Sequence, residues 1–131
     1  MKRRVVITGV GPITPIGIGK DEFWGNLIAG KSGIGLITQF DASDPGFTTK
    51  IAGEVKDFDF ANYDDKKEGK RMDRVTQFAV AAAKMAVEDA KLDLESIDPV
   101  RAGVCVGSGI GGMHTYLEQT LKFVEKGPSK I

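Results

Sequence analysis

The amino-acid sequence predicts an α/β fold. Two short apolar runs, within residues 3–10 and 101–106, have the contiguous, partly β-branched character of strands buried on both faces of a sheet. Three further segments, residues 21–29, 74–92 and 113–126, carry apolar side chains at helical spacing. The order strand, helix, loops, helix, strand, helix indicates an α/β protein.

The first strand is expected around Val5, Val6 and Ile7, and a group of glycines and prolines then ends it. The helix over residues 21–29 has acidic side chains in its first turn, which suit the helix dipole, and Gly30 stands where a C-terminal cap is needed. Residues 32–61 are rich in turn formers, and we predict only a short strand there, over residues 50–55.

The strongest helical signal runs over residues 74–92. Asp73 is a candidate cap at its start, and small alanine side chains predict close packing on more than one side. The second strand, residues 101–106, centres on Val104, Cys105 and Val106. The last helix, residues 113–126, is ended by Gly127 and Pro128.

Composition sets the broad class of the protein. The chain has 131 residues, enough for about one domain, and equal numbers of basic and acidic side chains, 18 of each. This balance gives no global reason to expect nucleic acid or an anionic membrane as a partner. A single cysteine excludes an internal disulfide, which indicates an intracellular protein, and no apolar run approaches the roughly 20 residues of a membrane span.

Two glycine-rich turns invite comparison with nucleotide-binding loops. The first, residues 9–12, lacks the third fingerprint glycine and contains Pro12, which has no amide to donate, so a structural turn is favoured over dinucleotide binding. The second, residues 107–112, is called the glycine loop below, and no acidic ribose-binding residue on a later strand follows it. Its single large side chain, Ile110, either gates a neighbouring site or packs into the core.

A charged stretch, residues 66–74, holds five basic and two acidic residues, a local charge of +3 in a neutral chain. We call it the basic segment; it either steers an acidic partner or forms a solvated helix face. Cys105, between two valines, is expected to be a buried structural cysteine, and His114 a surface or helix-start histidine. One cysteine and one histidine cannot form a metal cluster unaided, so no metal site is predicted.

Three stretches together resemble the condensing enzymes of fatty-acid synthesis, the β-ketoacyl-acyl carrier protein synthases, and the type II enzymes most. They are RRVVITG at residues 3–9, KEGKRMD at residues 67–73 and VGSGIGG at residues 106–112. The tail GPSKI at residues 127–131 agrees with them, and the resemblance covers the whole chain.

The resemblance implies part of the amino-terminal half of a thiolase-like α-β-α-β-α sandwich, with residues 1–131 an incomplete amino-terminal domain. It implies a cytoplasmic homodimer that lengthens acyl chains by decarboxylating Claisen condensation with malonyl carrier protein, using no cofactor or metal. The family's nucleophilic cysteine, histidines and lysine would lie beyond Ile131. The chain alone is therefore expected to have no catalytic residues and no condensing activity.

The family's peripheral roles can be carried over residue by residue. Lys67, Lys70 and Arg71 match positions that contact acyl carrier protein, and Ile110 and Met113 match positions of the acyl pocket. Gly69 departs from a larger polar residue, which puts the local helix in question. The alternatives left open are a non-catalytic module that binds carrier protein and a small nucleotide-binding α/β domain. We also expect apolar surface on the isolated chain at residues 5–7 and 104–106.

Overall fold

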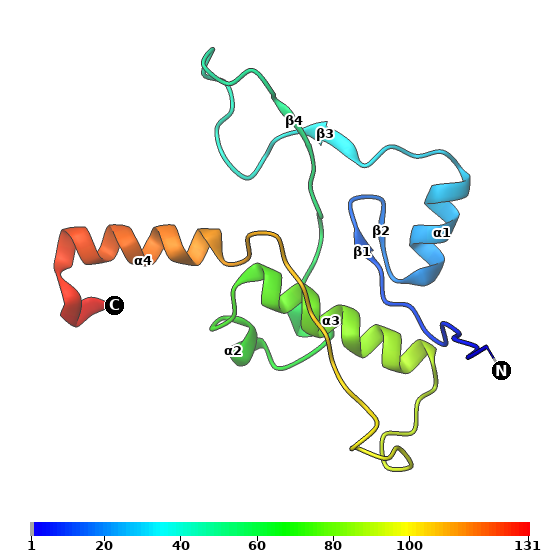
Figure 1. Cartoon of the computed structure of the whole chain (residues 1–131). Coiled ribbons are helices and arrows are strands. Elements are labelled where there is room, and N and C mark those ends of the chain that lie inside the picture. The colour runs from blue at the N-terminus through cyan, green and yellow to red at the C-terminus, as the bar shows by residue number, and fades with distance from the viewer. Residues whose placement is uncertain (1) are drawn as a thin grey trace. The chain divides into compact units, whose positions relative to one another are not determined.

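The computed structural model describes residues 2–131 (Figure 1). The chain forms two compact units, Met1–Asp59 with Ala82–Leu92, and Phe60–Ala81 with Asp93–Ile131. Helix α3, Arg74–Asp89, contributes to both of them, so we describe each unit separately.

The first unit contains two small antiparallel sheets and one helix. Strands β1, Ile13–Thr14, and β2, Gly17–Ile18, pair with Ile13 opposite Ile18. Strands β3, Ile34–Leu36, and β4, Ile51–Gly53, pair with Gly35 opposite Ala52. The predicted strand at residues 50–55 is thus confirmed as β4, whereas its partner β3 was not predicted.

Helix α1, Lys20–Ile28, lies within a residue of its predicted bounds. Gly30 follows it with a φ of 67°, in the left-handed region that glycine adopts most easily. The Lys31 amide donates to the Asn26 carbonyl at 3.0 Å and the Gly30 amide to the Leu27 carbonyl at 3.1 Å. These two bonds are those of a Schellman motif, so the predicted glycine cap is confirmed.

The turn at residues 9–12 packs closely on α3. A Cβ atom at Gly9 would lie 2.2 Å from the Ala86 carbonyl oxygen, and one at Gly11 would lie 2.1 Å from the Ala82 carbonyl oxygen. The alanines at positions 82, 86 and 90 succeed one another at helical spacing along this contact. The two glycines therefore allow the backbone to approach a helix, which supports the structural reading of this turn.

Asp89 fastens the same turn to α3. Its Oδ2 atom accepts a hydrogen bond from the Val10 amide at 3.0 Å, and its Oδ1 atom pairs with the Lys20 ammonium. The hydrogen bond from Lys20, followed by that from Val10, lowers the pKa of Asp89, and the same partnership raises the pKa of Lys20.

The ion pair and hydrogen bond of Asp89 should therefore make the stability of the fold depend on pH in the acidic range. Because its pKa is lower in the folded state, its contribution is complete above the ordinary value of about 4 and is lost as pH falls through the lowered one. Asp89→Asn is expected to reduce stability at neutral pH and to flatten the loss of stability between pH 4 and pH 2. Urea unfolding at neutral pH and between pH 4 and pH 2 measures the two effects, with Glu125→Gln as a control on exposed α4. Equal acid sensitivity in wild type and Asp89→Asn would contradict this assignment.

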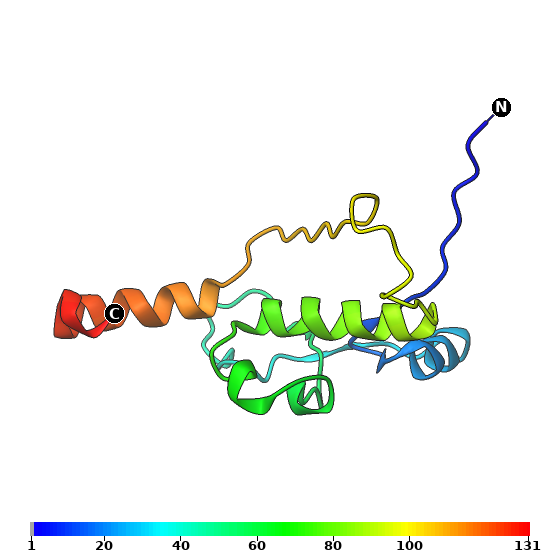
Figure 2. The ribbon, with the colours of Figure 1, turned by 90° about the horizontal axis from the view of Figure 1, so that it is seen from below.

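The second unit is helical in the part of the chain that the structure describes. It contains the 3₁₀ turn η1, Phe60–Asn62, helix α2, Lys66–Gly69, the first half of α3, helix α4, Met113–Lys126, and the 3₁₀ turn η2, Pro128–Lys130. Figure 2 shows α2 beside the first turns of α3. The predicted helices at residues 74–92 and 113–126 are confirmed, α4 with the same bounds.

Few apolar side chains are buried among the described residues: Ala42 in the first unit, and Phe60 and Ala81 in the second. Along α3, Ala81 is fully buried and residues 77–80 are half-buried. The four consecutive half-buried positions show that α3 is covered on more than one side, but only in part.

The two strands predicted at residues 3–10 and 101–106 are wrong for this structure. Neither segment forms a strand among the described residues, and Val5 and Val104 are 90% and 88% exposed. A strand needs a neighbouring strand for its amides and carbonyls, and neither run pairs with one among residues 2–131. Their exposure agrees with the apolar surface expected from the sequence at residues 5–7 and 104–106.

Candidate functional site

The five residues predicted to bind ligands fall in the second unit. Lys67 lies in α2, Lys70 and Arg71 follow it, and Ile110 and Met113 flank the start of α4. All five are exposed. The structure thus brings the basic segment and the glycine loop into one compact unit, although residues 75–106 separate them in the sequence.

The basic segment begins with a capped turn of helix. The Asp65 carboxylate accepts a hydrogen bond from the Lys67 amide at 2.6 Å, which satisfies one of the first amides of α2. After α2, the Arg71 amide donates to the Glu68 carbonyl at 3.0 Å and the Met72 amide to that of Gly69 at 3.2 Å. These bonds hold the backbone that carries Lys70 and Arg71 in a tight turn.

The contact with Phe60 explains why glycine, rather than a larger polar residue, stands at position 69 in this helix. A Cβ atom at position 69 would lie 2.4 Å from the Cδ1 atom of the buried Phe60 ring. The short helix forms with glycine here because the aromatic ring occupies the space that a larger side chain would need.

Gln77, which the sequence did not single out, secures the end of the basic segment to α3. Its Nε2 group donates to the Gly69 carbonyl at 2.8 Å and to the Met72 carbonyl at 3.2 Å. These two carbonyls lie on either side of Lys70 and Arg71, so both cationic side chains project from a backbone that is fixed at each end.

Arg71 keeps most of its charge available to a partner. Its guanidinium lies 3.6 Å from the Glu68 carboxylate, but its side chain is 80% exposed. An exposed pair of this kind contributes at most about 1 kcal/mol to stability and is screened by salt. The local charge of +3 therefore remains at the surface as a candidate recognition element for an acidic partner.

The glycine loop is exposed, and Ile110 is 77% accessible to solvent. The alternative that Ile110 packs into the core is thus wrong for this structure. Beside it, a Cβ atom at Gly111 would lie 3.3 Å from the Val75 side chain, and Gly112 adopts a φ of 72°. The end of the loop therefore lies against the first turn of α3, whereas the Ile110 side chain projects outward.

Asp73 links the starts of two helices. Its Oδ1 atom accepts from the Val75 amide at 3.0 Å, so the predicted cap of α3 is confirmed. Its Oδ2 atom accepts from the Thr115 hydroxyl at 2.6 Å and from the Thr115 amide at 3.4 Å, in the first turn of α4. The hydroxyl of Thr115 and then the amide of Val75 hold the pKa of Asp73 below its usual value.

Cys105 corrects another expectation. It was predicted to be buried in a strand, but it is exposed in the segment before the glycine loop, where no strand of residues 2–131 pairs with it. His114 is the second residue of α4, as a helix-start histidine should be. Within residues 2–131, no three histidine, cysteine, aspartate or glutamate side chains are grouped to hold a metal ion.

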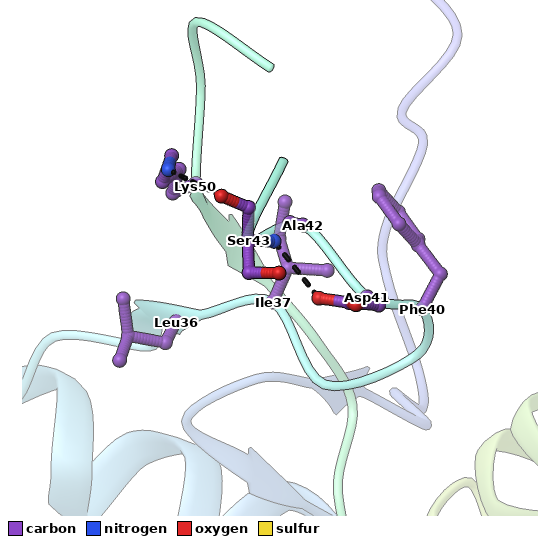
Figure 3. A pocket seen from close by; sticks show the side chains of 7 residues that line it. All are labelled: Leu36, Ile37, Phe40, Asp41, Ala42, Ser43 and Lys50. Carbon is purple, nitrogen blue, oxygen red and sulfur yellow. Dashed lines mark hydrogen bonds between the residues drawn. The ribbon is translucent and has the colours of Figure 1, made fainter. Parts of the chain in front are cut away.

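A separate hollow lies in the first unit, beside β3 (Figure 3). It has a volume of about 260 Å³, with an apolar wall that includes Leu36, Ile37 and Phe40. Lys50 Nζ donates to the Ser43 carbonyl at 3.1 Å, and the Ser43 amide donates to Asp41 at 2.9 Å. The polar groups at its rim thus bind one another, and none of the predicted site residues lines it.

Comparison with known proteins identifies the family. The sequence model of the β-ketoacyl synthase N-terminal domain matches residues 2–130. The chain therefore belongs to the β-ketoacyl synthase family. No helix in the described part of the chain has the length and apolar character needed to cross a membrane.

Similar proteins agree with this assignment. The chain is 47% identical over 129 residues to 3-oxoacyl-(acyl-carrier-protein) synthase 2 of Synechocystis, and 44% identical to the enzyme of that name from Staphylococcus aureus. These alignments cover 98% of this chain but only 30% and 31% of the relatives. The chain thus spans about a third of the length of the curated relatives it matches.

Solved structures extend the comparison to the fold. A chain of the ishigamide ketosynthase/chain length factor matches with a TM-score of 0.82 and 38% identity, over 97% of this chain and 31% of that one. A chain of the solved complex between a type II polyketide synthase acyl carrier protein and its ketosynthase matches with a TM-score of 0.72 and 33% identity, over 97% of this chain and 28% of that one. The α/β, thiolase-like fold class predicted from the sequence is confirmed.

Proposed function

We propose that residues 1–131 form the amino-terminal portion of the amino-terminal domain of a type II β-ketoacyl-acyl carrier protein synthase. The observation that carries the proposal is the family match over residues 2–130, together with 47% identity to a 3-oxoacyl-(acyl-carrier-protein) synthase 2. The complete protein would lengthen fatty acyl chains in the cytoplasm as a homodimer.

The proposed reaction is a decarboxylating Claisen condensation. An acyl group is first held as a thioester on a cysteine of the enzyme. Malonyl carrier protein then loses carbon dioxide, and the resulting carbanion attacks the thioester carbonyl. A carbon–carbon bond forms, and the cysteine thiolate leaves. These steps need neither a redox cofactor nor a metal.

Residues 1–131 supply peripheral parts of this machinery rather than its reacting groups. Cys105 lies outside the helices and strands of the described residues, and His114 is nine positions away along the chain. The chain alone is therefore proposed to be inactive. Lys67, Lys70 and Arg71 would contact the acidic carrier protein, and Ile110 and Met113 would contact the acyl chain.

The local charge supports acyl carrier protein as the partner. The net charge is zero, so long-range attraction of an acidic protein must come from a concentrated patch such as the basic segment. The similar ketosynthase solved with an acyl carrier protein makes this partner chemically reasonable for a related chain. Neither nucleic acid nor a membrane is proposed as a partner.

A condensation assay tests the proposal. The complete protein, supplied with acyl and malonyl carrier protein, is expected to release carbon dioxide and form the 3-oxoacyl product, and residues 1–131 alone are expected to form none. Carrier-protein binding without condensation by the complete protein would favour the non-catalytic module. Absence of both binding and condensation would contradict the synthase proposal, and saturable dinucleotide binding lost in Gly109→Val would favour the nucleotide-binding alternative.

A further inference from the structure

Asp73 lies where three parts of the second unit meet. It belongs to the basic segment, directly after Met72, caps α3 through Val75, and binds Thr115 in α4. Asp73 and Thr115, which its Oδ2 atom binds, are 42 positions apart in the sequence. It is thus placed to tie the basic segment to the glycine loop.

Helix α4 needs this outside partner because of its own N-cap. The N-cap residue is Gly112, which has no side chain to accept hydrogen bonds from the first-turn amides. Ser, Thr, Asp or Asn normally supplies that acceptor locally. Here the Asp73 carboxylate supplies it from a distance, and the Thr115 hydroxyl adds a short bond of 2.6 Å to a charged acceptor.

The same arrangement determines where the glycine loop ends. A Cβ atom at Gly112 would lie 4.0 Å from Asp73 Oδ2, and one at Gly111 would lie 3.3 Å from the side chain of Val75. Ile110 immediately precedes these two residues, between glycines at positions 109 and 111. Glycine backbones are permissive, so contacts at the end of the loop are needed to hold the Ile110 side chain in one place.

We propose that Asp73 is a positioning residue that, through Thr115, holds the glycine loop and hence Ile110 in a fixed place relative to the basic segment. This inference rests on the proposed function, because it assigns Ile110 to the acyl pocket and the basic segment to carrier-protein recognition. Gln77 binds the carbonyls of Gly69 and Met72, so the backbone of the basic segment is also held to α3. Docking of the carrier protein and entry of its acyl chain would then occur on one connected framework.

Thr115 offers the cleanest test, since Asp73 also caps α3 and its removal would disturb two helices. Thr115→Val keeps the shape of the side chain and removes the hydroxyl donor. Thr115→Ser keeps the donor and serves as the conservative rescue. The variants are made in the complete protein, and urea unfolding verifies that each is folded.

Hydrogen exchange of the amides of residues 107–115 measures how firmly the bond between Asp73 and Thr115 holds the glycine loop. Thr115→Val is expected to exchange there about tenfold faster than wild type, a factor that corresponds to the loss of one charge-assisted hydrogen bond, and Thr115→Ser within about threefold. Exchange in Thr115→Val equal to that of wild type would overturn the proposal.

The functional readout separates positioning from general stability. Thr115→Val is expected to bind acyl carrier protein within about twofold of the wild-type affinity but to accept its acyl chain about tenfold more slowly, and Thr115→Ser should restore the rate. A fall in affinity and rate that only follows lost stability would overturn the assignment.

The two proposals fail in different ways. If the wild-type protein does not accept an acyl chain at all, the proposed function fails, whereas unchanged hydrogen exchange in Thr115→Val defeats the positioning role alone. Faster exchange with an unchanged acyl-transfer rate would show that the link does not position Ile110 for the reaction, and would also overturn the proposal.

Discussion

Gly11→Ala is expected to destabilise the protein by roughly 3 kcal/mol, at the upper end of the usual cost of overpacking. The added Cβ would lie 2.1 Å from the Ala82 carbonyl oxygen and 2.9 Å from the Ala86 amide nitrogen, both backbone atoms of α3. A side chain could rotate away, but these atoms are held by the helix. The turn or the helix would have to move, and the hydrogen bond between Val10 and Asp89 would be strained with it.

Chemical denaturation measures this effect, and Gly25→Ala provides the matched control. Gly25 lies within α1, and a Cβ there would meet no described heavy atom within 4 Å. Alanine is better than glycine in a helix interior by about 1 kcal/mol, so the control should gain stability. An unchanged denaturation midpoint for Gly11→Ala would show that the close approach to α3 does not exist in solution.

The helices could be predicted from the sequence because their signals are local. The spacing of apolar side chains, Gly30 after α1, Asp73 before α3 and the Gly127–Pro128 pair after α4 all lie within a few residues of the elements they define. Each cap satisfies amides or carbonyls of its own helix, so no distant part of the chain is needed to form it.

A strand forms only with a partner strand, and this is why the predictions of strands at residues 3–10 and 101–106 were wrong. Val5 and Val104 lie in runs with high strand propensity, yet both are exposed and unpaired among the described residues. Propensity describes how well a side chain fits a pleated, covered surface, and it cannot create that surface. The same reasoning explains Cys105, whose predicted burial depended on the strand around it.

The residues of the candidate site can be proposed from the sequence, but the hydrogen bonds that connect them cannot. The cluster of Lys67, Lys70 and Arg71 is visible in the sequence as a local excess of positive charge. The bond between Asp73 and Thr115 crosses 42 residues, and no local pattern marks it. Only the absence of a side-chain cap at Gly112 could have suggested that α4 takes its acceptor from elsewhere.

Lys70→Glu combined with Arg71→Glu is expected to weaken acyl carrier protein binding at least about tenfold at low salt, because like charges then face each other across the interface. The effect should diminish as salt rises, since exposed charges are screened over about 10 Å at 0.1 M ionic strength. Arg71 is weakly paired with Glu68, so its reversal should cost little stability. Titration of the carrier protein at several salt concentrations measures the affinity, with unfolding as a separate check.

Lys2→Glu combined with Lys31→Glu is the matched control, since it changes the net charge equally at exposed positions outside the basic segment. If both double variants lose affinity alike, overall charge rather than a docking surface governs binding. If neither loses affinity at low salt, the basic segment is a solvated face, and the carrier protein must be recognised elsewhere. A loss confined to Lys70→Glu with Arg71→Glu would place recognition on the turn that Gln77 anchors, next to the link through Asp73 to the glycine loop.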